Sequence, residues 1–258
     1  MSVDWTPLRN ELRHWQADDL EFPLWWRDDD AISVTDQLKT LTAISESLEL
    51  PVHLAVIPQE ARTSLVDFCA DSPFLIPVVH GWAHQNHAPD VEKKSEFRLH
   101  RPMAEMVAEI KNGINKLGNL FGDRLCPMFV PPWNRIAAET VQQLPILGFR
   151  FLSTATPRET RFIAPGLEQI NTHIDPIDWH GTRSLIEPDI IVGDVVSLLR
   201  DRREGLADNS EPLGVLTHHL VHDQAVWAFT RELIVRLLEG PATVWADLET
   251  LNNQGDHG

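Results

Sequence analysis

The sequence of 258 residues contains no tyrosine and only two cysteines, Cys69 and Cys126. Both cysteines lie among apolar residues, so we expect buried thiols in a reducing compartment rather than a disulfide framework. No apolar run is long enough to span a bilayer, and residues 1–19 lack the apolar segment of a signal peptide. These absences predict a cytoplasmic protein with no membrane partner.

Basic residues are also scarce. The sequence has 22 lysines and arginines but 38 aspartates and glutamates, which gives a net charge of −16. A charge of this sign opposes binding to nucleic acid and to anionic membrane surfaces, so neither is expected as a partner.

Apolar runs of strand length alternate with helical patterns along most of the chain. Strands are expected at residues 22–27, 51–58, 74–79, 126–130, 149–153, 170–177, 212–217 and 242–246, with a loop at 154–168. Helices are expected at residues 1–20, 33–48, 60–70, 102–120, 137–147, 188–203 and 223–238. About seven alternations without a linker predict one domain over residues 1–258 with a mostly parallel sheet. Such a sheet suits a closed or nearly closed barrel, and an open doubly wound sheet is the alternative.

Negative charge is concentrated in Asp28, Asp29 and Asp30, which directly follow the apolar strand at 22–27. An isolated acidic triplet is more often a solvated turn before a helix than a site. Here four later stretches repeat the layout of an apolar strand followed by polar groups, and α/β proteins collect ligands at the carboxyl ends of their strands. Adjacent carboxylates raise one another's pKa unless a cation is present, so the cluster is a candidate cation site.

The strand at 74–79 delivers His80, and His84 follows four residues later. Two histidines at this spacing can share one face of a helical turn, which suits two ligands of one metal ion. Alone, the spacing is more often incidental, but an aspartate cluster at an equivalent strand end reverses the odds. One carboxylate, two imidazoles and an open position are typical of a catalytic metal site rather than a closed structural one.

Three further strands lead into chemically distinctive groups. The consecutive prolines at 131 and 132 would fix a rigid loop that could wall a pocket. Residues 175–180 place aromatic and acidic side chains together, and the strand at 212–217 delivers His218, a possible general acid. Five tryptophans adjoin these groups and either pack in the core or stack on sugar rings: Trp25, Trp26, Trp82, Trp133 and Trp179.

The ordered set resembles the polysaccharide deacetylases, the NodB-like carbohydrate esterases. That family has, in chain order, an Asp-Asp motif, a His-x-x-x-His motif, an Arg-x-Pro-aromatic motif, an Asp/Trp motif and a Leu-x-His motif. Counterparts of all five occur here in the same order over residues 25–223. The resemblance implies a distorted (β/α) barrel of about seven strands, a divalent metal ion that is usually zinc, and N- or O-deacetylation.

The same resemblance implies roles for individual residues. Asp29 would be the general base and His218 the general acid, while the fourth-motif carboxylate is either Asp175 or Asp178. The metal ligands would be Asp30, His80 and His84. The residues expected to contact the substrate are Trp26, Trp82, Pro132, Trp133, Asp178 and Trp179.

Two positions depart from the family pattern in ways that matter for the site. Val130 stands where the family has an arginine that orients the base, so Arg135 or Arg27 would have to replace it. We assign this catalytic role to Arg135, and expect its guanidinium to contact Asp29. Gly81 replaces the usual serine or threonine, which removes a hydrogen bond within the loop.

These features predict a metal-dependent hydrolase that removes an acyl group, most simply acetyl, from an amide of a sugar or a related small molecule. The absence of a signal peptide favours a small intracellular substrate over a cell-wall polymer. Two alternatives stay open. Allantoinase-like hydrolysis of a cyclic amide or ureide without metal is disfavoured by the complete aspartate–histidine–histidine set. A catalytically silent sugar- or metal-binding barrel is favoured by the missing arginine at position 130.

Overall fold

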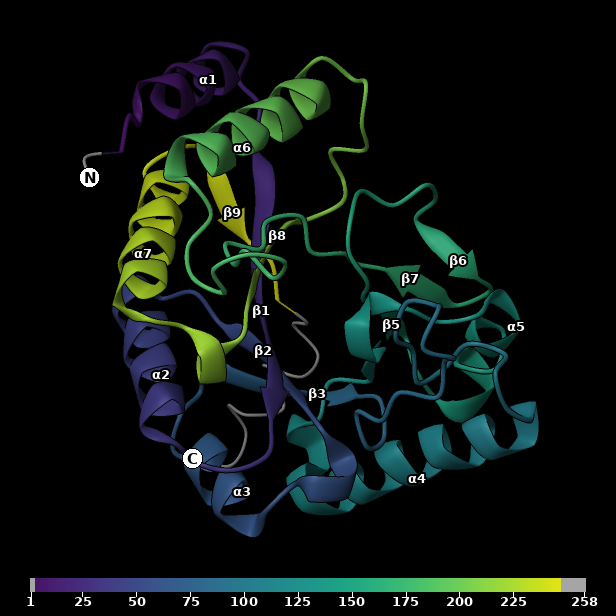
Figure 1. Ribbon diagram of the computed structural model, residues 1–258. Helices are drawn as coiled ribbons and strands as arrows, with labels where there is room; N and C mark the ends of the chain where they lie inside the picture. Colours follow the sequence, from purple (N-terminus) through teal and green to yellow (C-terminus); the bar gives the residue numbers. More distant parts are fainter. Residues whose placement is uncertain (1–2, 247–258) are drawn as a thin grey trace.

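The structure is a computed structural model that describes residues 3–246, and within this range nine strands form one curled sheet (Figure 1). The strand order is β6-β7-β5-β4-β3-β2-β1-β8, and β9 also pairs with β1. Every pairing is parallel except that of β6 with β7. The strands are β1 (Phe22–Ala31), β2 (Val52–Val56), β3 (Leu75–His80), β4 (Met128–Val130), β5 (Phe151–Leu152), β6 (Phe162–Ala164), β7 (Leu167–Gln169), β8 (Leu213–Thr217) and β9 (Ala242–Val244).

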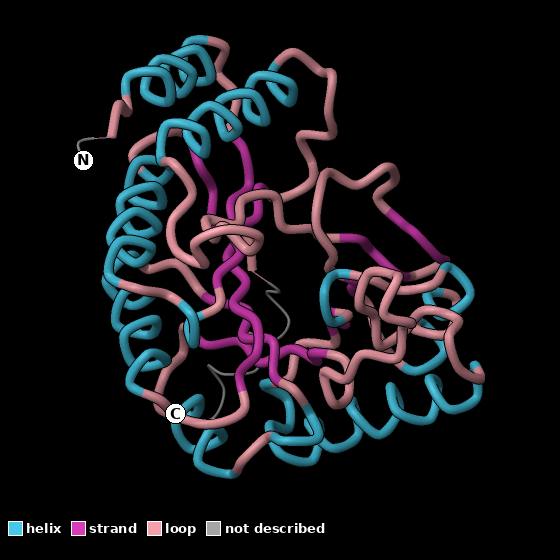
Figure 2. The backbone as a smooth tube through the Cα atoms, viewed as in Figure 1, coloured by secondary structure: helices cyan, strands magenta, loops and turns pink. Residues whose placement is uncertain are grey.

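The helices lie around the outside of this sheet, as the cyan and magenta segments of Figure 2 show. They are α1 (Thr6–Ala17), α2 (Asp36–Leu48), α3 (Thr63–Ala70), α4 (Met103–Phe121), α5 (Ala138–Val141), α6 (Pro188–Arg203) and α7 (Gln224–Leu238). The longest, α4, buries Met106, Ile110 and Leu117, whose spacing gives a single apolar stripe towards the sheet. None of the described helices has the length and apolarity needed to cross a bilayer.

The side chains of β1 alternate between two apolar layers. Leu24 and Trp26 belong to the layer between the sheet and the helices, whereas Trp25 belongs to a smaller cluster inside the curled sheet. Trp245, just after β9, packs edge-on against Trp25 with ring centroids 5.6 Å apart. Because β9 pairs with the first residues of β1, this packing fills the amino-terminal end of the barrel and leaves the carboxyl ends of the strands for the site.

The curled, mostly parallel sheet confirms the distorted barrel predicted from the sequence, and Cys69 and Cys126 are buried as expected. Three local predictions were wrong. The strand expected to end at residue 27 continues through the acidic cluster to Ala31, because the fold supplies partners for its carboxylates. The loop expected at 154–168 contains the antiparallel pair β6 and β7. The strand expected at 170–177 forms only isolated bridges.

Residues 170–174 close the gap between the two sides of the sheet without forming a regular strand. The backbone N–H of Thr172 donates to Thr154 O at 3.0 Å on one side, and that of His173 donates to Gly214 O at 2.8 Å on the other. The crossing is tight, since a Cβ atom at position 214 would lie 2.5 Å from Asn171 O. This contact requires glycine in β8, and it sets the path of the chain that continues to Asp175 in the cleft described below.

We therefore expect Gly214→Ala to lower the free energy of unfolding by about 1–3 kcal/mol, the usual cost of overpacking. Gly193→Ala is the matched control, because Gly193 lies on α6 with no atom within 4 Å of the added Cβ. In a helix that change should stabilise by up to about 1 kcal/mol. Urea unfolding of both variants measures the two effects, and equal effects would contradict the tight crossing.

Candidate functional site

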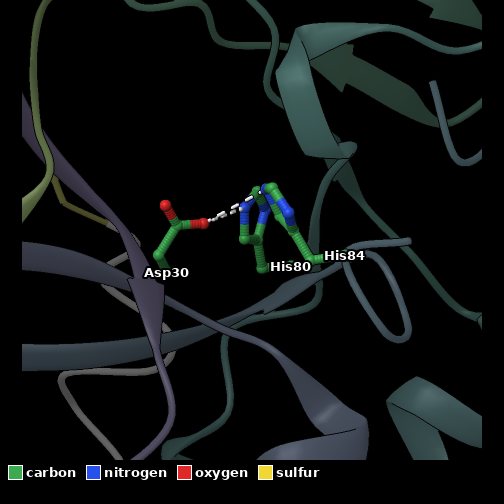
Figure 3. Close-up of side chains that lie close together, drawn as sticks. All are labelled: Asp30, His80 and His84. Carbon is green, nitrogen blue, oxygen red and sulfur yellow. Dashed lines mark hydrogen bonds and ion pairs between the residues drawn. The ribbon is translucent and has the colours of Figure 1, made fainter. Parts of the chain in front are cut away.

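Three potential metal ligands meet at the carboxyl ends of β1 and β3. Asp30 Oδ1 lies 3.1 Å from His80 Nε2 and 3.3 Å from His84 Nε2, and all three ligand atoms lie within 4.8 Å of one another (Figure 3). His80 is the last residue of β3, and His84 follows in the loop. The structure therefore places the three residues predicted as metal ligands next to one another.

A bulge in β1 and a positive φ set the direction of the Asp30 side chain. The register between β1 and β2 shifts between Asp28 and Ala31, and Asp30 has a φ of 75°. A bulge of this kind re-aims a side chain that would otherwise alternate to the other face of the strand. Consequently both Asp29 and Asp30 line one cleft, although they are neighbours in sequence.

The donor set fits a divalent cation. His80 Nδ1 lies 3.0 Å from Val130 O, and a proton on Nδ1 would leave Nε2 free as a ligand atom. Two imidazole nitrogens and one carboxylate oxygen are the protein ligands of many catalytic zinc sites, which keep a further position open. Val130 thus contributes through its backbone carbonyl, although its side chain lacks the family's guanidinium.

Asp30, His80 and His84 shift one another's pKa values. Burial opposes ionisation of Asp30, but the hydrogen bond to His80 and the charges of both histidines outweigh burial and lower the pKa of this carboxyl. Burial lowers the pKa of His80, but the neighbouring Asp29 and Asp30 more than offset burial and raise it. For His84, burial and the adjacent His80 lower the pKa. A cation at the centre would compete with a proton on His80, since histidine binds metal as the neutral imidazole.

The loop that carries His84 is held by a residue that sequence reasoning missed. The carboxylate of Glu96, which is 1% exposed, accepts backbone N–H bonds from Trp82 at 3.2 Å and from Ala83 at 2.8 Å. A Cβ atom on Gly81 would lie 2.3 Å from Glu96 Oε2, and Gly81 has a φ of +54°. Glycine is therefore required here, and Glu96 supplies hydrogen bonds to the loop. Burial raises the pKa of Glu96 despite these bonds.

The carboxylate of Asp29 is held by Arg27, two residues earlier on the same strand. Arg27 Nε lies 2.9 Å from Asp29 Oδ1, and Nη2 donates to Oδ2 at 3.0 Å. The guanidinium also donates to Ser153 Oγ at 2.7 Å and to Asn134 Oδ1 at 2.8 Å, and Arg27 is completely buried. Arg27 therefore makes the contact that the family's arginine would make from position 130.

The assignment of Arg135 to this role was wrong. Its Nη1 donates to Lys94 O at 2.9 Å at the edge of the cleft, away from Asp29. The residue follows a short turn in which Trp133 and Asn134 both have positive φ, and this turn directs Asn134 rather than Arg135 towards Arg27. Strand alternation is a signal that favours Arg27, because it lies two residues before Asp29, but the strand was expected to end at residue 27.

The two adjacent histidines after β8 face different surroundings. His218 lines the cleft, with Nε2 4.0 Å from Asp29 Oδ2, and its ring packs against Trp179 at 4.7 Å. His219 is buried, and its Nδ1 lies 2.5 Å from Asp28 Oδ1. Burial opposes ionisation of Asp28. The charge of His219 and the hydrogen bonds from His219 and Thr217 outweigh burial and lower the pKa of this carboxyl. His219 thus fastens the end of β8 to β1 behind the cleft.

The structure separates the two candidate aspartates of the fourth motif. Asp175 lines the cleft, accepts a hydrogen bond from Trp179 Nε1 at 2.7 Å, and has a pKa raised by burial. Asp178 instead accepts backbone N–H bonds from Gly181 and Thr182 in an exposed turn. Asp178 was therefore placed wrongly among the substrate contacts.

Only two of the five other expected substrate contacts could reach a ligand in the cleft, a space of about 710 Å³. Trp133 and Trp179 line it. Trp26 is fully buried in the outer core layer, where Nε1 donates to Thr217 Oγ1 at 2.9 Å. Trp82 packs against the same layer.

Pro132 was also expected to contact the substrate, and this too was wrong. It is buried, and its ring lies against Gly81, where an added Cβ would come within 2.6 Å of Cδ. The rigid proline pair thus supports the histidine loop from behind rather than walling the pocket.

No family model and no curated protein matches the sequence, whereas 42 chains of solved structures match the fold. A family 4 carbohydrate esterase from Streptomyces lividans, solved with acetate, has a TM-score of 0.57 at 16% identity, over 87% of this chain and 92% of the other. The chain has the fold of the family 4 carbohydrate esterases. At this identity the likeness establishes the architecture, which confirms the fold implied by the sequence motifs.

Two other neighbours differ in activity. A peptidoglycan N-acetylglucosamine deacetylase has a TM-score of 0.55 at 16% identity, over 93% of this chain and 95% of the other. A mutant of a family 4 pseudoenzyme with restored activity has a TM-score of 0.57 at 15% identity, over 90% of this chain and 68% of the other. Since the fold accommodates both, the side chains in the cleft must carry any functional argument.

We expect Arg27→Met to lower the free energy of unfolding by about 3–5 kcal/mol, because it leaves the buried Asp29 carboxylate without its counterion. Arg135→Gln, a change at the cleft edge, should stay within about 0.5 kcal/mol. The double variant Arg27→Met/Asp29→Asn should cost less than the sum of the two single changes, since no buried charge remains. Urea unfolding of all variants measures these differences, and additive costs would argue against the pair.

Proposed function

We propose that the chain is a single-domain, metal-dependent hydrolase that removes an acyl group from an amide, with acetyl as the simplest case. The observation that carries this proposal is the joint placement of Asp30, His80 and His84 beside Asp29 and His218 on one cleft. A cation site, a carboxylate and an imidazole together can supply the activated water, the base and the acid for hydrolysis of an unactivated amide.

The cation would be held by Asp30, His80 and His84, and zinc suits two imidazoles with a carboxylate. When bound, a divalent cation polarises a carbonyl and lowers the pKa of a bound water towards about 7. The protein groups then have to move protons between defined atoms.

Asp29 is the proposed general base. Arg27 Nη2 donates to Oδ2 and Nε forms an ion pair with Oδ1, and so the guanidinium fixes the orientation of Asp29 while leaving lone pairs for a water proton. This geometry positions the acceptor before the reaction begins, which is how fixed groups contribute to rate.

His218 is the proposed general acid. Its Nε2 faces the same part of the cleft as Asp29 Oδ2, 4.0 Å away, so the amide nitrogen can receive a proton as the C–N bond breaks. A neutral amine leaves far more readily than an amine anion, and this is why amides need the acid. Trp179 packs against the imidazole and restricts its orientation.

A saccharide is the proposed substrate class. Trp133 and Trp179 line the cleft and offer aromatic faces to a sugar ring, and the neighbouring folds include a deacetylase of N-acetylglucosamine residues. A cytoplasmic location belongs to this proposal, and the low cysteine content is consistent with it.

Two alternatives have less support. Metal-free hydrolysis of a cyclic amide or ureide does not account for the convergence of Asp30, His80 and His84. A catalytically silent barrel drew its support from the absent arginine at position 130, and Arg27 supplies the corresponding contact.

The first test is metal content. We expect the purified protein to hold about one equivalent of a divalent metal, measured by plasma mass spectrometry, and Asp30→Ala or His84→Ala to lose it. His87→Ala is the control, because His87 lies in the same loop outside the ligand cluster. Unchanged metal in both ligand variants would end the ligand assignment.

The second test separates the paired histidines. His218→Ala should keep the metal and the fold but lower kcat/KM for an N-acetylated sugar by about 10²–10⁴-fold, the usual contribution of a general acid. The loss should be smaller for an activated acetate ester, whose leaving group needs no proton.

His219→Ala is the comparison for this test. It should act mainly on stability, because it leaves Asp28 buried without its partner. Acetate release and urea unfolding measure both variants. Full amide activity in His218→Ala, or the larger catalytic loss in His219→Ala, would move the acid to another residue.

A further inference from the structure

The floor and the rim of the cleft differ in charge. On the floor, Asp29 contacts the guanidinium of Arg27, and Asp30 contacts two imidazoles. The rim carries four basic side chains, and none of them forms an ion pair with a carboxylate within residues 3–246. These rim cations are Lys93, Lys94, Arg135 and Arg183.

Lys93, Lys94 and Arg135 form one wall of the cleft. Arg135 Nη1 donates to Lys94 O at 2.9 Å, which keeps the guanidinium beside the lysine segment. Partial burial and the charge of Arg98 lower the pKa of Arg135, so two guanidinium groups lie close enough to repel each other. The one carboxylate on this wall, Glu92, lies 3.7 Å from His100 instead.

Arg183 also lines the cleft, together with Trp179. Its guanidinium lies over the indole ring at 5.8 Å from the centroid, a cation–π contact at the mouth of the cleft. Its backbone N–H donates to Asp178 O at 2.9 Å, and its φ is +56°. The turn that Asp178 caps therefore presents this cation to the cleft in a restrained position.

Exposed lysines are ordinarily solvated and need no ligand. Here the chain has a net charge of −16, with only 22 basic residues to distribute. Four of them line this cleft without an ion-pair partner among residues 3–246, so an anion bound beside them would offset their mutual repulsion. The same arrangement attracts anions locally to a protein that otherwise repels them.

We propose that the substrate carries an anionic group, a phosphate or a carboxylate, which these rim cations bind while the acyl amide lies on the cleft floor. The inference deepens the proposed deacetylase function and rests on it. A cleft of about 710 Å³ lies within the range of about 300–1,000 Å³ that is usual for small-molecule sites. Arginine suits this role because its planar donors match phosphate and carboxylate oxygens.

The test compares N-acetylglucosamine, N-acetylglucosamine 6-phosphate and N-acetylmuramic acid by titration calorimetry on the purified holoprotein. At least one charged sugar should bind at least about tenfold more tightly than the neutral sugar, the effect of one charge-assisted contact. The preferred sugar distinguishes phosphate from carboxylate. The preference should fall about fivefold or more in Arg183→Gln and in Lys94→Gln, and also at high salt.

Lys111→Gln is the matched control, since it removes the same charge from an exposed position on α4 outside the cleft. Repeating the titration with chelated protein excludes anion binding by the metal itself. A preference that disappears on chelation but survives both rim substitutions would overturn the proposal. Equal affinity for all three sugars, including no measurable affinity for any, would overturn it as well.

Acetate release from the same three sugars tests the anionic specificity separately from the proposed deacetylase activity. Release at equal kcat/KM from charged and neutral sugars would leave the deacetylase standing and remove the anionic specificity. A charge preference in binding without acetate release from any sugar would leave the anion site standing and remove the deacetylase. If both hold, the rim substitutions should raise KM with little change in kcat, because they bind ground state and transition state alike.

Discussion

The buried contact between Arg27 and Asp29 is the interaction on which the arrangement of the site depends. The two residues lie two apart on β1, so their side chains emerge on the same face and can pair within one strand. A guanidinium with no exposed surface is tolerable only when its donors are used, and here Ser153 and Asn134 take the remaining ones. These partners follow β5 and β4. One cation therefore ties the ends of three strands around the carboxylate proposed as the base.

On the opposite face of β1, the buried carboxylate of Asp28 is likewise stabilised by polar partners. Asp28 points towards the helices, where Thr217 Oγ1 donates to it at 2.6 Å and His219 lies within hydrogen-bond distance. The three adjacent aspartates thus face different surroundings: Asp28 behind the sheet, Asp29 against an arginine, and Asp30 against two imidazoles. Separation by strand alternation and by the bulge relieves the repulsion that three neighbouring carboxylates would otherwise suffer.

The sequence predicted what depends on local pattern. Hydrophobic periodicity located the long helices and most strands, and motif order placed Asp30, His80 and His84 together. It failed where partners come from distant segments. Glu96 lies in a polar stretch with no motif, and its role appears only when three backbone N–H groups of residues 82–85 converge on it. Trp26 adjoins the acidic motif, yet strand alternation turns it into the core.

Backbone strain shows why such distant support is needed. Of the eight non-glycine residues with positive φ in residues 3–246, five line the cleft: Asp30, His84, Trp133, Asn134 and Arg183. Each such conformation costs on the order of 1 kcal/mol or more and persists only when the surroundings enforce it. Glu96 enforces the histidine loop, and Arg27 enforces the turn at Asn134 through its side-chain oxygen. Glu96 was missed in the sequence, and Arg27 was named only as the alternative to Arg135, because the contacts through which both stabilise these strained segments form only in the assembled fold.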